Sequence, residues 1–180
     1  MQETSTLALV LDITQTGEQD GRVVLFTQAA GKIIARAKSL YKPRSKLAAH
    51  VQPLSIVQVR LVEKKGVQVV DALLVRRYGG NATGPTQTIE LLSAARLIGE
   101  LTSLNQPDDQ LWSVIASGKL VSRQLLKVLG FDPEHASCSR CHKHEPTHFL
   151  LRDAVYICST CFGLAGRTIG VAPALGVKLG

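Results

Sequence analysis

The sequence predicts an α+β protein in which a five-stranded OB-fold barrel is followed by a short helical region with an embedded cysteine-rich element. Three observations support this class. Short apolar runs with alternating side chains occupy the first eighty residues, the apolar spacing becomes helical beyond residue 85, and two C-x-x-C pairs lie near the carboxyl end. We expect a barrel (1–80), a linker and helical region (81–137), a cysteine-rich element (138–162) and a C-terminal segment (163–180) that packs on the helical region.

Five strands are expected in the first part of the chain. Leucine and isoleucine alternate from Leu7 to Ile13, and the turn signal Asp20-Gly21 precedes the next apolar run. In the third strand, one face carries Lys32, Ile34, Arg36 and Lys38, and the other carries Ile33, Ala35 and Ala37. The strands are expected at 7–13, 22–27, 32–38, 54–62 and 67–75.

Five short strands with no helix between most of them predict a small closed barrel. The OB-fold is such a barrel, and it commonly binds nucleic acid on one open face. An SH3-like barrel is the alternative. The connection between the third and fourth strands, 40–53, contains Pro43 and Pro53, which predict an irregular loop where many OB-folds place a helix.

Beyond the glycine-rich linker Gly79–Pro85, apolar residues recur at helical spacing. Helices are expected over 86–101, from about Asp108, which can cap the second helix, and over about 121–129, ending at Gly130. Trp112 is in register with apolar neighbours, so we interpret it as a packing residue rather than a base-stacking platform. The final stretch, 163–180, is consistent with a packing helix or a returning strand.

All four cysteines of the chain lie in two C-x-x-C pairs separated by sixteen residues. Two residues between thiolates let both sulfurs face one ion, and a connector of about 15–20 residues lets a hairpin bring the second pair to complete a tetrahedron. We predict one structural Zn²⁺, because four thiolates leave no position for a catalytic water. The predicted ligands are Cys138, Cys141, Cys158 and Cys161.

Other interpretations of the cysteines are weaker. Two disulfides suit an oxidising compartment, whereas residues 1–6 lack the basic start and apolar core of a signal peptide. A thioredoxin-like redox pair uses one C-x-x-C beside a βαβ unit, not two matched pairs. His142, His144 and His148 lie in the connector, but the complete set of thiolates favours histidines that do not bind the metal.

The composition is that of a globular chain, since 45% of its 180 residues are hydrophobic, enough for a packed core. No apolar stretch approaches the about 18–20 residues that cross a bilayer, so we expect a cytoplasmic protein. The sequence has no phosphate-binding loop, G-x-S-x-G elbow or H-E-x-x-H helix, and its acidic residues are scattered. We therefore expect no enzymatic activity.

The net charge of +7 is concentrated in the barrel half of the chain. Residues 1–80 carry twelve Lys or Arg and six Asp or Glu, whereas residues 81–180 carry nine and eight. Residues 32–46 hold six cations and no carboxylate, a run that suits phosphate, although a solvated face is a common alternative. The candidate nucleic-acid-binding residues are Lys32, Arg36, Lys38, Tyr41, Lys42, Arg44 and Lys46.

In the order of its parts and in local motifs, the chain resembles the RecO family of bacterial recombination mediators. The similar segments are Glu18–Thr27, Gly31–Lys38, Lys42–Leu47, Gln52-Pro53-Leu54-Ser55 and the approach to the first cysteine pair, Leu125–Glu134. The helical middle, from Thr86 to Gly130, is shorter than is usual in that family. The chain therefore resembles an unusually short member.

The resemblance implies a non-enzymatic role in DNA repair and recombination. Such a protein binds single- and double-stranded DNA, anneals complementary strands, and helps RecA replace single-strand-binding protein during gap repair, usually together with RecR. It is cytoplasmic and associated with the nucleoid.

Other functional classes stay open at this point. Charge does not distinguish DNA from RNA, so a zinc-ribbon or ribosome-associated RNA-binding module is the first alternative. A protein scaffold whose barrel binds an acidic peptide is the second. A metal-dependent nuclease is the weakest, because the nearest carboxylates, Asp12, Glu18 and Asp20, fit turns and strand ends better than a paired site.

Overall fold

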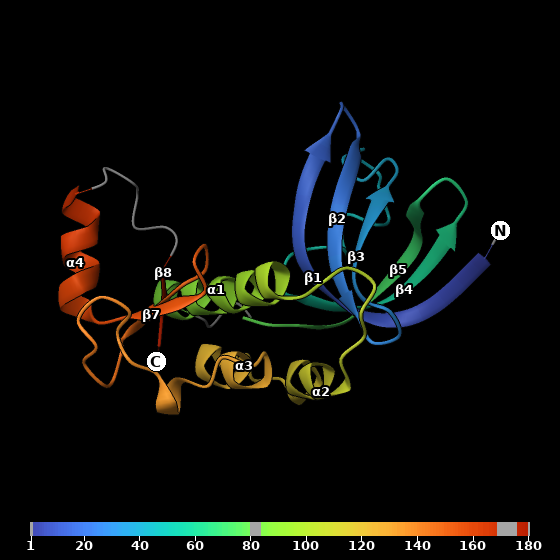
Figure 1. The fold of residues 1–180 in the computed structure, drawn as a ribbon. Coiled ribbons are helices and arrows are strands. Elements are labelled where there is room, and N and C mark those ends of the chain that lie inside the picture. The colour runs from blue at the N-terminus through green and yellow to red at the C-terminus, as the bar shows by residue number, and fades with distance from the viewer. Residues whose placement is uncertain (1, 80–83, 169–175, 180) are drawn as a thin grey trace.

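The structure, a computed structural model, describes residues 2–79, 84–168 and 176–179. A β-barrel lies at one end of the molecule, three helices pack beside it, and a small cysteine-rich element lies at the other end (Figure 1). Most of the predicted linker, namely residues 80–83, lies outside the described residues. Within the described ranges, no helix combines the length and the apolar character that crossing a bilayer requires.

Five strands close the barrel in the order β1-β2-β3-β5-β4. Their bounds are β1 (Gln2–Thr16), β2 (Asp20–Thr27), β3 (Gly31–Ala37), β4 (Ser55–Glu63) and β5 (Val67–Arg77). β1 pairs with β4 through its first half and with β2 through its second half, and β3 pairs in parallel with β5. This closed five-stranded order confirms the predicted OB-fold.

Alternating side chains divide each strand between the barrel interior and its outer surface. In β3, Ile33, Ala35 and Ala37 are buried in the interior, while Ile34 and Arg36 face outward, which is the division that the sequence predicted. Most of the interior is aliphatic, with leucine, valine and isoleucine from all five strands. A register shift of one residue would expose this set, so the pattern holds the strands in register.

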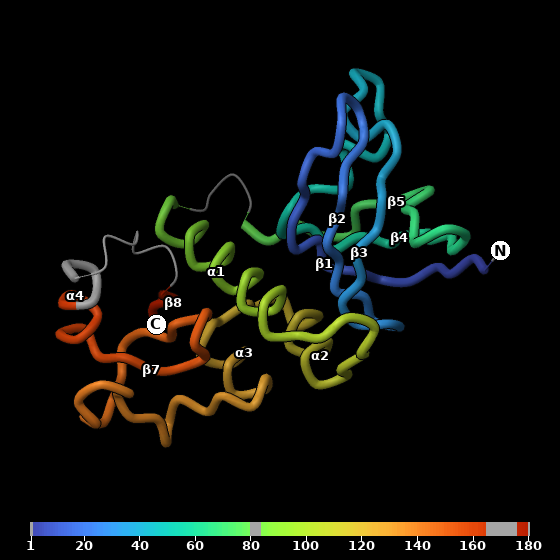
Figure 2. Tube along the Cα trace, turned by 45° about the horizontal axis from the view of Figure 1, so that its top comes forward, coloured from blue at the N-terminus to red at the C-terminus, as the bar shows by residue number. Residues whose placement is uncertain are grey.

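The connection between β3 and β4 is an irregular loop, as its two prolines predicted. Leu40 and Val51 of this loop are buried with the interior residues and close one end of the barrel. A Cβ atom at Gly21 would lie 2.5 Å from Leu40 Cδ2, so the glycine lets the loop pack closely on β2. Tyr41 N–H donates to the Gln19 carbonyl at 2.9 Å, which brings the loop beside the β1–β2 turn (Figures 1 and 2).

The helices of the middle region are α1 (Pro85–Leu101), α2 (Asp109–Ser117) and α3 (Ser122–Val128). Asp108 caps α2 as predicted, since its carboxylate accepts the Leu111 N–H at 2.8 Å. Gly118 ends α2 in the left-handed conformation, and Gly130 follows α3 with φ +88°. Short capped helices of this kind depend on packing for most of their stability.

One buried apolar cluster joins the helices to the outer surface of the barrel. Phe26 and Ile56 of the barrel belong to it, together with Ile98 of α1 and Trp112 and Ile115 of α2. Trp112 is 7% exposed, which confirms that it packs rather than presenting a stacking surface. The barrel and helices therefore form one packed body.

Two barrel cations bind the carboxyl ends of helices at this junction. The Arg76 guanidinium donates to the Ile115 and Ala116 carbonyls of α2 at 3.3 and 3.2 Å. The Lys32 ammonium donates to the Gly99 carbonyl of α1 at 2.7 Å. The last turn of a helix has unpaired carbonyls and a partial negative charge, so both contacts stabilise the docked helices.

The C-terminal part of the chain folds around a three-stranded sheet in the order β7-β6-β8. Its elements are the 3-10 turn η1 (Pro133–His135), β6 (His148–Leu150), β7 (Val155–Ile157), α4 (Ser159–Thr168) and β8 (Gly176–Lys178). Phe149 and Val177 of this sheet share a buried cluster with Leu97 of α1 and Leu126 of α3. The end of the chain thus returns as a strand, while the predicted apolar positions 169, 171 and 175 lie outside the described residues.

Candidate metal centre and nucleic-acid interface

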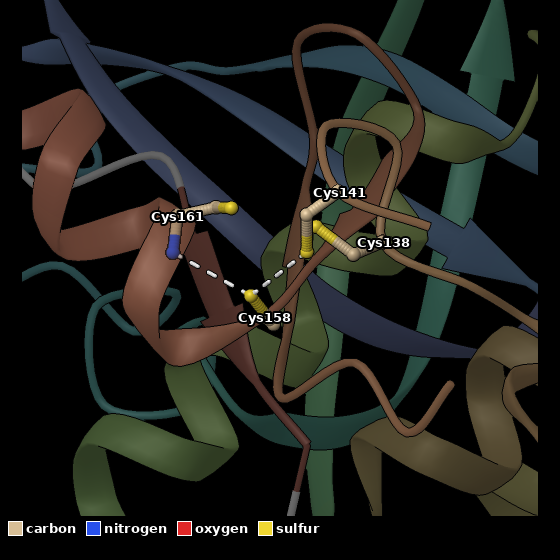
Figure 3. Close-up of side chains that lie close together, drawn as sticks. All are labelled: Cys138, Cys141, Cys158 and Cys161. Atoms are coloured by element: carbon tan, nitrogen blue, oxygen red, sulfur yellow. Dashed lines mark hydrogen bonds between the residues drawn. The ribbon is translucent and has the colours of Figure 1, made fainter. Parts of the chain in front are cut away.

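Four cysteine side chains converge in the C-terminal element (Figure 3). Their sulfur atoms all lie within 4.8 Å of one another, and all but that of Cys141 belong to buried residues. Two come from the loop that carries Cys138 and Cys141, and two from the junction of β7 with α4. The structure therefore brings together the ligand set that the spacing predicted.

Each cysteine pair is shaped by a short local structure. In the first, His142 N–H donates to the Cys138 carbonyl at 2.9 Å, and His142 takes the left-handed conformation with φ 56°, which reverses the chain. In the second, Cys158 follows β7 and Cys161 lies in the first turn of α4, where its N–H donates to the Cys158 sulfur at 3.5 Å. Both arrangements point sulfur atoms toward one common space.

The sulfur geometry fits a tetrahedral metal ion. A Zn–S distance of about 2.3 Å places neighbouring sulfurs of a tetrahedron about 3.8 Å apart. The Cys141 and Cys158 sulfurs lie 3.7 Å apart. Four sulfur donors fill a tetrahedron, so the geometry is that of a site that stabilises the fold.

The ionisation of the sulfurs also favours a cation. Burial alone would raise the pKa of the Cys138 thiol, but backbone N–H groups of Cys158, Cys141 and Arg140 lower this pKa to about 6. The pKa of Cys161 is raised to about 12, chiefly because its thiol bonds to the Cys158 sulfur. Four negative sulfurs repel one another, so all become thiolates only around a positive ion.

The connector histidines lie outside this cluster. His148 Nδ1 is 2.8 Å from Thr147 Oγ1, and its ring stacks on Phe162 with the ring centres 4.2 Å apart. His142 and His144 are exposed. In the part of the chain that the structure describes, the only group that could hold a metal is the four cysteines.

Most of the candidate nucleic-acid-binding residues gather at the barrel end remote from the helices. Five of them lie at the end of β3 and along the β3–β4 loop, and all five are exposed. We call this set the basic loop: Lys38, Tyr41, Lys42, Arg44 and Lys46. Among the described residues, none of its four cations has an ion pair or a side-chain hydrogen bond. Their charges are therefore available to a ligand.

Arg36 lies next to the basic loop but is already paired. Its guanidinium contacts Asp20 Oδ2 at 2.6 Å on the outer surface of β2 and β3. Arg22 lies directly opposite Arg36 in the β2–β3 ladder and is exposed, so two arginines adjoin on this surface. The alternation in the second predicted strand was the signal that could have identified Arg22.

Two further cations, Lys64 and Lys65, are exposed in the turn between β4 and β5. In OB-folds the surface of strands 2 and 3 and the turn between strands 4 and 5 commonly bind oligonucleotides. The sequence identified Lys64 and Lys65 only as a turn signal, because only the closed barrel shows which turn adjoins which surface.

Lys32 is the one candidate that the structure separates from the others. Lys38 lies six positions further along the chain, a distance of about 20 Å for an extended strand. Its side chain is half-buried against α1, where the ammonium is bound by the Gly99 carbonyl. Its neighbour Leu104 forms an isolated bridge with it, so Lys32 lies at the junction of barrel and helices.

Replacement of Lys32 should therefore affect stability more than DNA affinity. Lys32→Met keeps the aliphatic chain and removes the ammonium, so we expect the free energy of unfolding to fall by about 0.5–2 kcal/mol. DNA affinity should change by less than about twofold. Urea denaturation and a binding titration measure the two effects, with Lys38→Met as the control that weakens binding only. If Lys32→Met had wild-type stability but strongly reduced DNA binding, Lys32 would belong to the candidate DNA-binding surface after all.

Comparison with known proteins agrees with this architecture. The family model described as Recombination protein O N terminal matches residues 1–78, the barrel. The chain is 27% identical over 187 residues to DNA repair protein RecO of Bacillus subtilis (strain 168), an alignment that covers 92% of this chain and 71% of the relative.

Two further relatives carry the same name. DNA repair protein RecO of Heliobacterium modesticaldum is 32% identical over 147 residues, covering 74% of this chain and 54% of the relative. That of Anaeromyxobacter sp. (strain K) is 24% identical over 192 residues, covering 96% and 76%. The chain thus spans about half to three quarters of the length of these relatives. The family model matches the barrel and the alignments continue beyond it, so the chain is similar to DNA repair proteins named RecO over most of its length.

Proposed function

We propose that this chain is a non-enzymatic recombination mediator that binds single- and double-stranded DNA, anneals complementary strands and assists RecA loading during gap repair. The observation that supports DNA binding most directly is the basic loop, whose four exposed cations have no partner among the described residues. In this proposal RecR and single-strand-binding protein are its protein partners.

Annealing requires two polyanions to approach each other. A dense group of cations lowers their mutual repulsion by neutralising phosphates, and contacts to phosphates carry no sequence information. Tyr41, 43% exposed, is the only aromatic residue of the basic loop, so base stacking contributes little compared with charge. We therefore expect binding that is salt-dependent and nearly independent of sequence.

The number of free cations sets the expected salt dependence. If the four cations of the basic loop each neutralise a phosphate of single-stranded DNA, log K against log salt has a slope of about −3, from about 0.7 per contact. Replacement of Lys38, Lys42 and Arg44 by glutamate leaves one of these cations, so the magnitude of the slope should fall below about 1. It should also abolish annealing, with and without single-strand-binding protein present.

A matched variant separates local from overall charge. Lys119, Arg123 and Arg152 are exposed in the helical region and the C-terminal element, and their replacement by glutamate changes the net charge equally. This second variant should retain the wild-type slope and annealing rate. Equal loss in both variants, or undiminished binding by a folded loop variant, would reject the basic loop as the DNA-binding surface.

We further propose that the cysteine cluster binds one Zn²⁺ with a structural role. The ion would be held by Cys138, Cys141, Cys158 and Cys161, and it would join the first loop to the β7–α4 junction. Four cysteine sulfurs within 4.8 Å of one another are a donor set that zinc prefers in structural sites.

A further inference from the structure

Asp20, the first residue of β2, contacts both Arg36 on β3 and the start of the β3–β4 loop. Its Oδ2 atom accepts hydrogen bonds from Arg36 Nη2 and Nε at 2.6 and 3.1 Å. Its Oδ1 atom accepts the backbone N–H of Ser39 at 2.8 Å. One carboxylate thereby connects the outer surface of β3 to Ser39, the second residue of the loop that follows it.

The Ser39 contact fixes the direction in which the basic loop leaves β3. Ser39 has φ 55°, a left-handed conformation that a residue other than glycine adopts only at a cost. The hydrogen bond to Asp20 compensates that cost, and the Tyr41 N–H donating to Gln19 holds the next turn to the same hairpin. Lys38 immediately precedes this bend, and Tyr41 and Lys42 follow it.

The Arg36 contact, in contrast, reduces the positive charge that this surface offers to phosphate. Arg36 lies beside the exposed Arg22, yet its guanidinium is held by Asp20 and is only partly available to a phosphate. The backbone N–H of Ser39 and the Arg36 guanidinium keep the pKa of Asp20 below its ordinary value, so the carboxylate stays charged near neutral pH.

We infer that Asp20 is a positioning residue of the DNA-binding surface, which orients the basic loop through Ser39 while it holds Arg36 back from phosphate. This inference rests on the proposed DNA binding. It assigns two separable effects to one side chain, because different oxygen atoms make the two contacts. The contact with Ser39 orders the loop and so increases the affinity for DNA. The contact with Arg36 neutralises a cation and so decreases that affinity.

Substitution of Asp20 separates the two effects. In Asp20→Asn the carboxamide oxygen can still accept the Ser39 N–H, while the charge that holds Arg36 is lost. We expect about tenfold tighter binding of a single-stranded oligonucleotide and a salt slope steeper by about 0.7, the contribution of one added phosphate contact. Asp20→Ala loses both contacts, so it should bind more weakly than Asp20→Asn.

Glu18→Gln provides the matched control. Glu18 is exposed in the same β1–β2 turn, and among the described residues its side chain forms no hydrogen bond or ion pair with Arg36 or Ser39. This variant therefore removes the same charge without altering either contact. It should gain no more than about twofold in affinity and keep the wild-type slope. Equal changes in Glu18→Gln and Asp20→Asn would show a general charge effect and overturn the inference.

Amide hydrogen exchange tests the loop contact without DNA. The Ser39 amide should be protected in the wild type and in Asp20→Asn and exchange at least about tenfold faster in Asp20→Ala. Unchanged protection in Asp20→Ala, with equal DNA binding by the two Asp20 variants, would reject the positioning role. A wild-type chain that binds no DNA would instead reject the proposed function, and the exchange result would still report on the Asp20 contact.

Discussion

Removal of the proposed Zn²⁺, by a chelator or by Cys158→Ser, is expected to unfold the C-terminal element while the barrel stays folded. Three of the cysteines, Cys138, Cys158 and Cys161, form that element's small buried cluster together with Ile157, and Phe162 packs against it. Structural zinc sites contribute about 10–16 kcal/mol of apparent binding free energy, far more than such a cluster supplies. The barrel interior shares no residue with this cluster and should keep its strand order.

Metal analysis of the purified protein should find one zinc per chain. Amide hydrogen exchange of the metal-free protein then shows which part of the chain unfolds. Protection should disappear at amides that tie the element together, such as Ser139, which donates to Tyr156, and Thr147, which donates to Ile157. Ser159→Ala is the control, because Ser159 is exposed and lies between Cys158 and Cys161 in the sequence. This variant should keep both the metal and the protection of these amides from exchange. A metal-free protein with full protection would contradict the zinc assignment.

Gly31→Ala is expected to disrupt the junction of barrel and helices, with a loss of about 3–5 kcal/mol in the free energy of unfolding. A Cβ atom at Gly31 would lie 1.8 Å from the Gln106 carbonyl oxygen and 2.8 Å from Pro107 N. These are backbone atoms of the α1–α2 connection, so no side-chain rotation relieves the overlap. Gly31 also has φ +67°, which disfavours alanine by itself.

Gly17→Ala isolates the conformational part of this effect. Gly17 has nearly the same φ, +70°, but a Cβ atom there would meet nothing within 4 Å. It should lower stability by only about 1 kcal/mol. Urea denaturation of the two variants gives the difference, which measures the close approach of helices and barrel. Similar losses in both would show that the junction tolerates displacement.

Much of the architecture follows from local pattern. Alternation in β3 predicted which of its residues are buried, because the side chains of a strand point to opposite faces wherever one face lies in a core. The two C-x-x-C pairs predicted that the four cysteine side chains converge, since their spacing restricts the geometry. Asp108 marked the start of α2, and Gly130 marked the end of α3, through the preferences of helix caps.

The candidate DNA-binding surface was less predictable, because charge in a sequence does not identify the partner of each cation. Lys32 and Lys38 are equivalent in the pattern of β3, yet one binds the end of α1 and the other is exposed at the loop. Arg36 has the same periodicity, and its pairing with Asp20 depends on the β2–β3 register. Arg22 joins this surface for the same reason.

By itself, the sequence determined the strands, the caps, the cysteine cluster and the basic character of the barrel half, because short-range periodicity and spacing encode each of them. Only the tertiary structure decided which cations stay free, which hold helices and which are neutralised. Those outcomes depend on contacts between residues far apart in the chain, such as Lys32 with Gly99, and no local pattern records them.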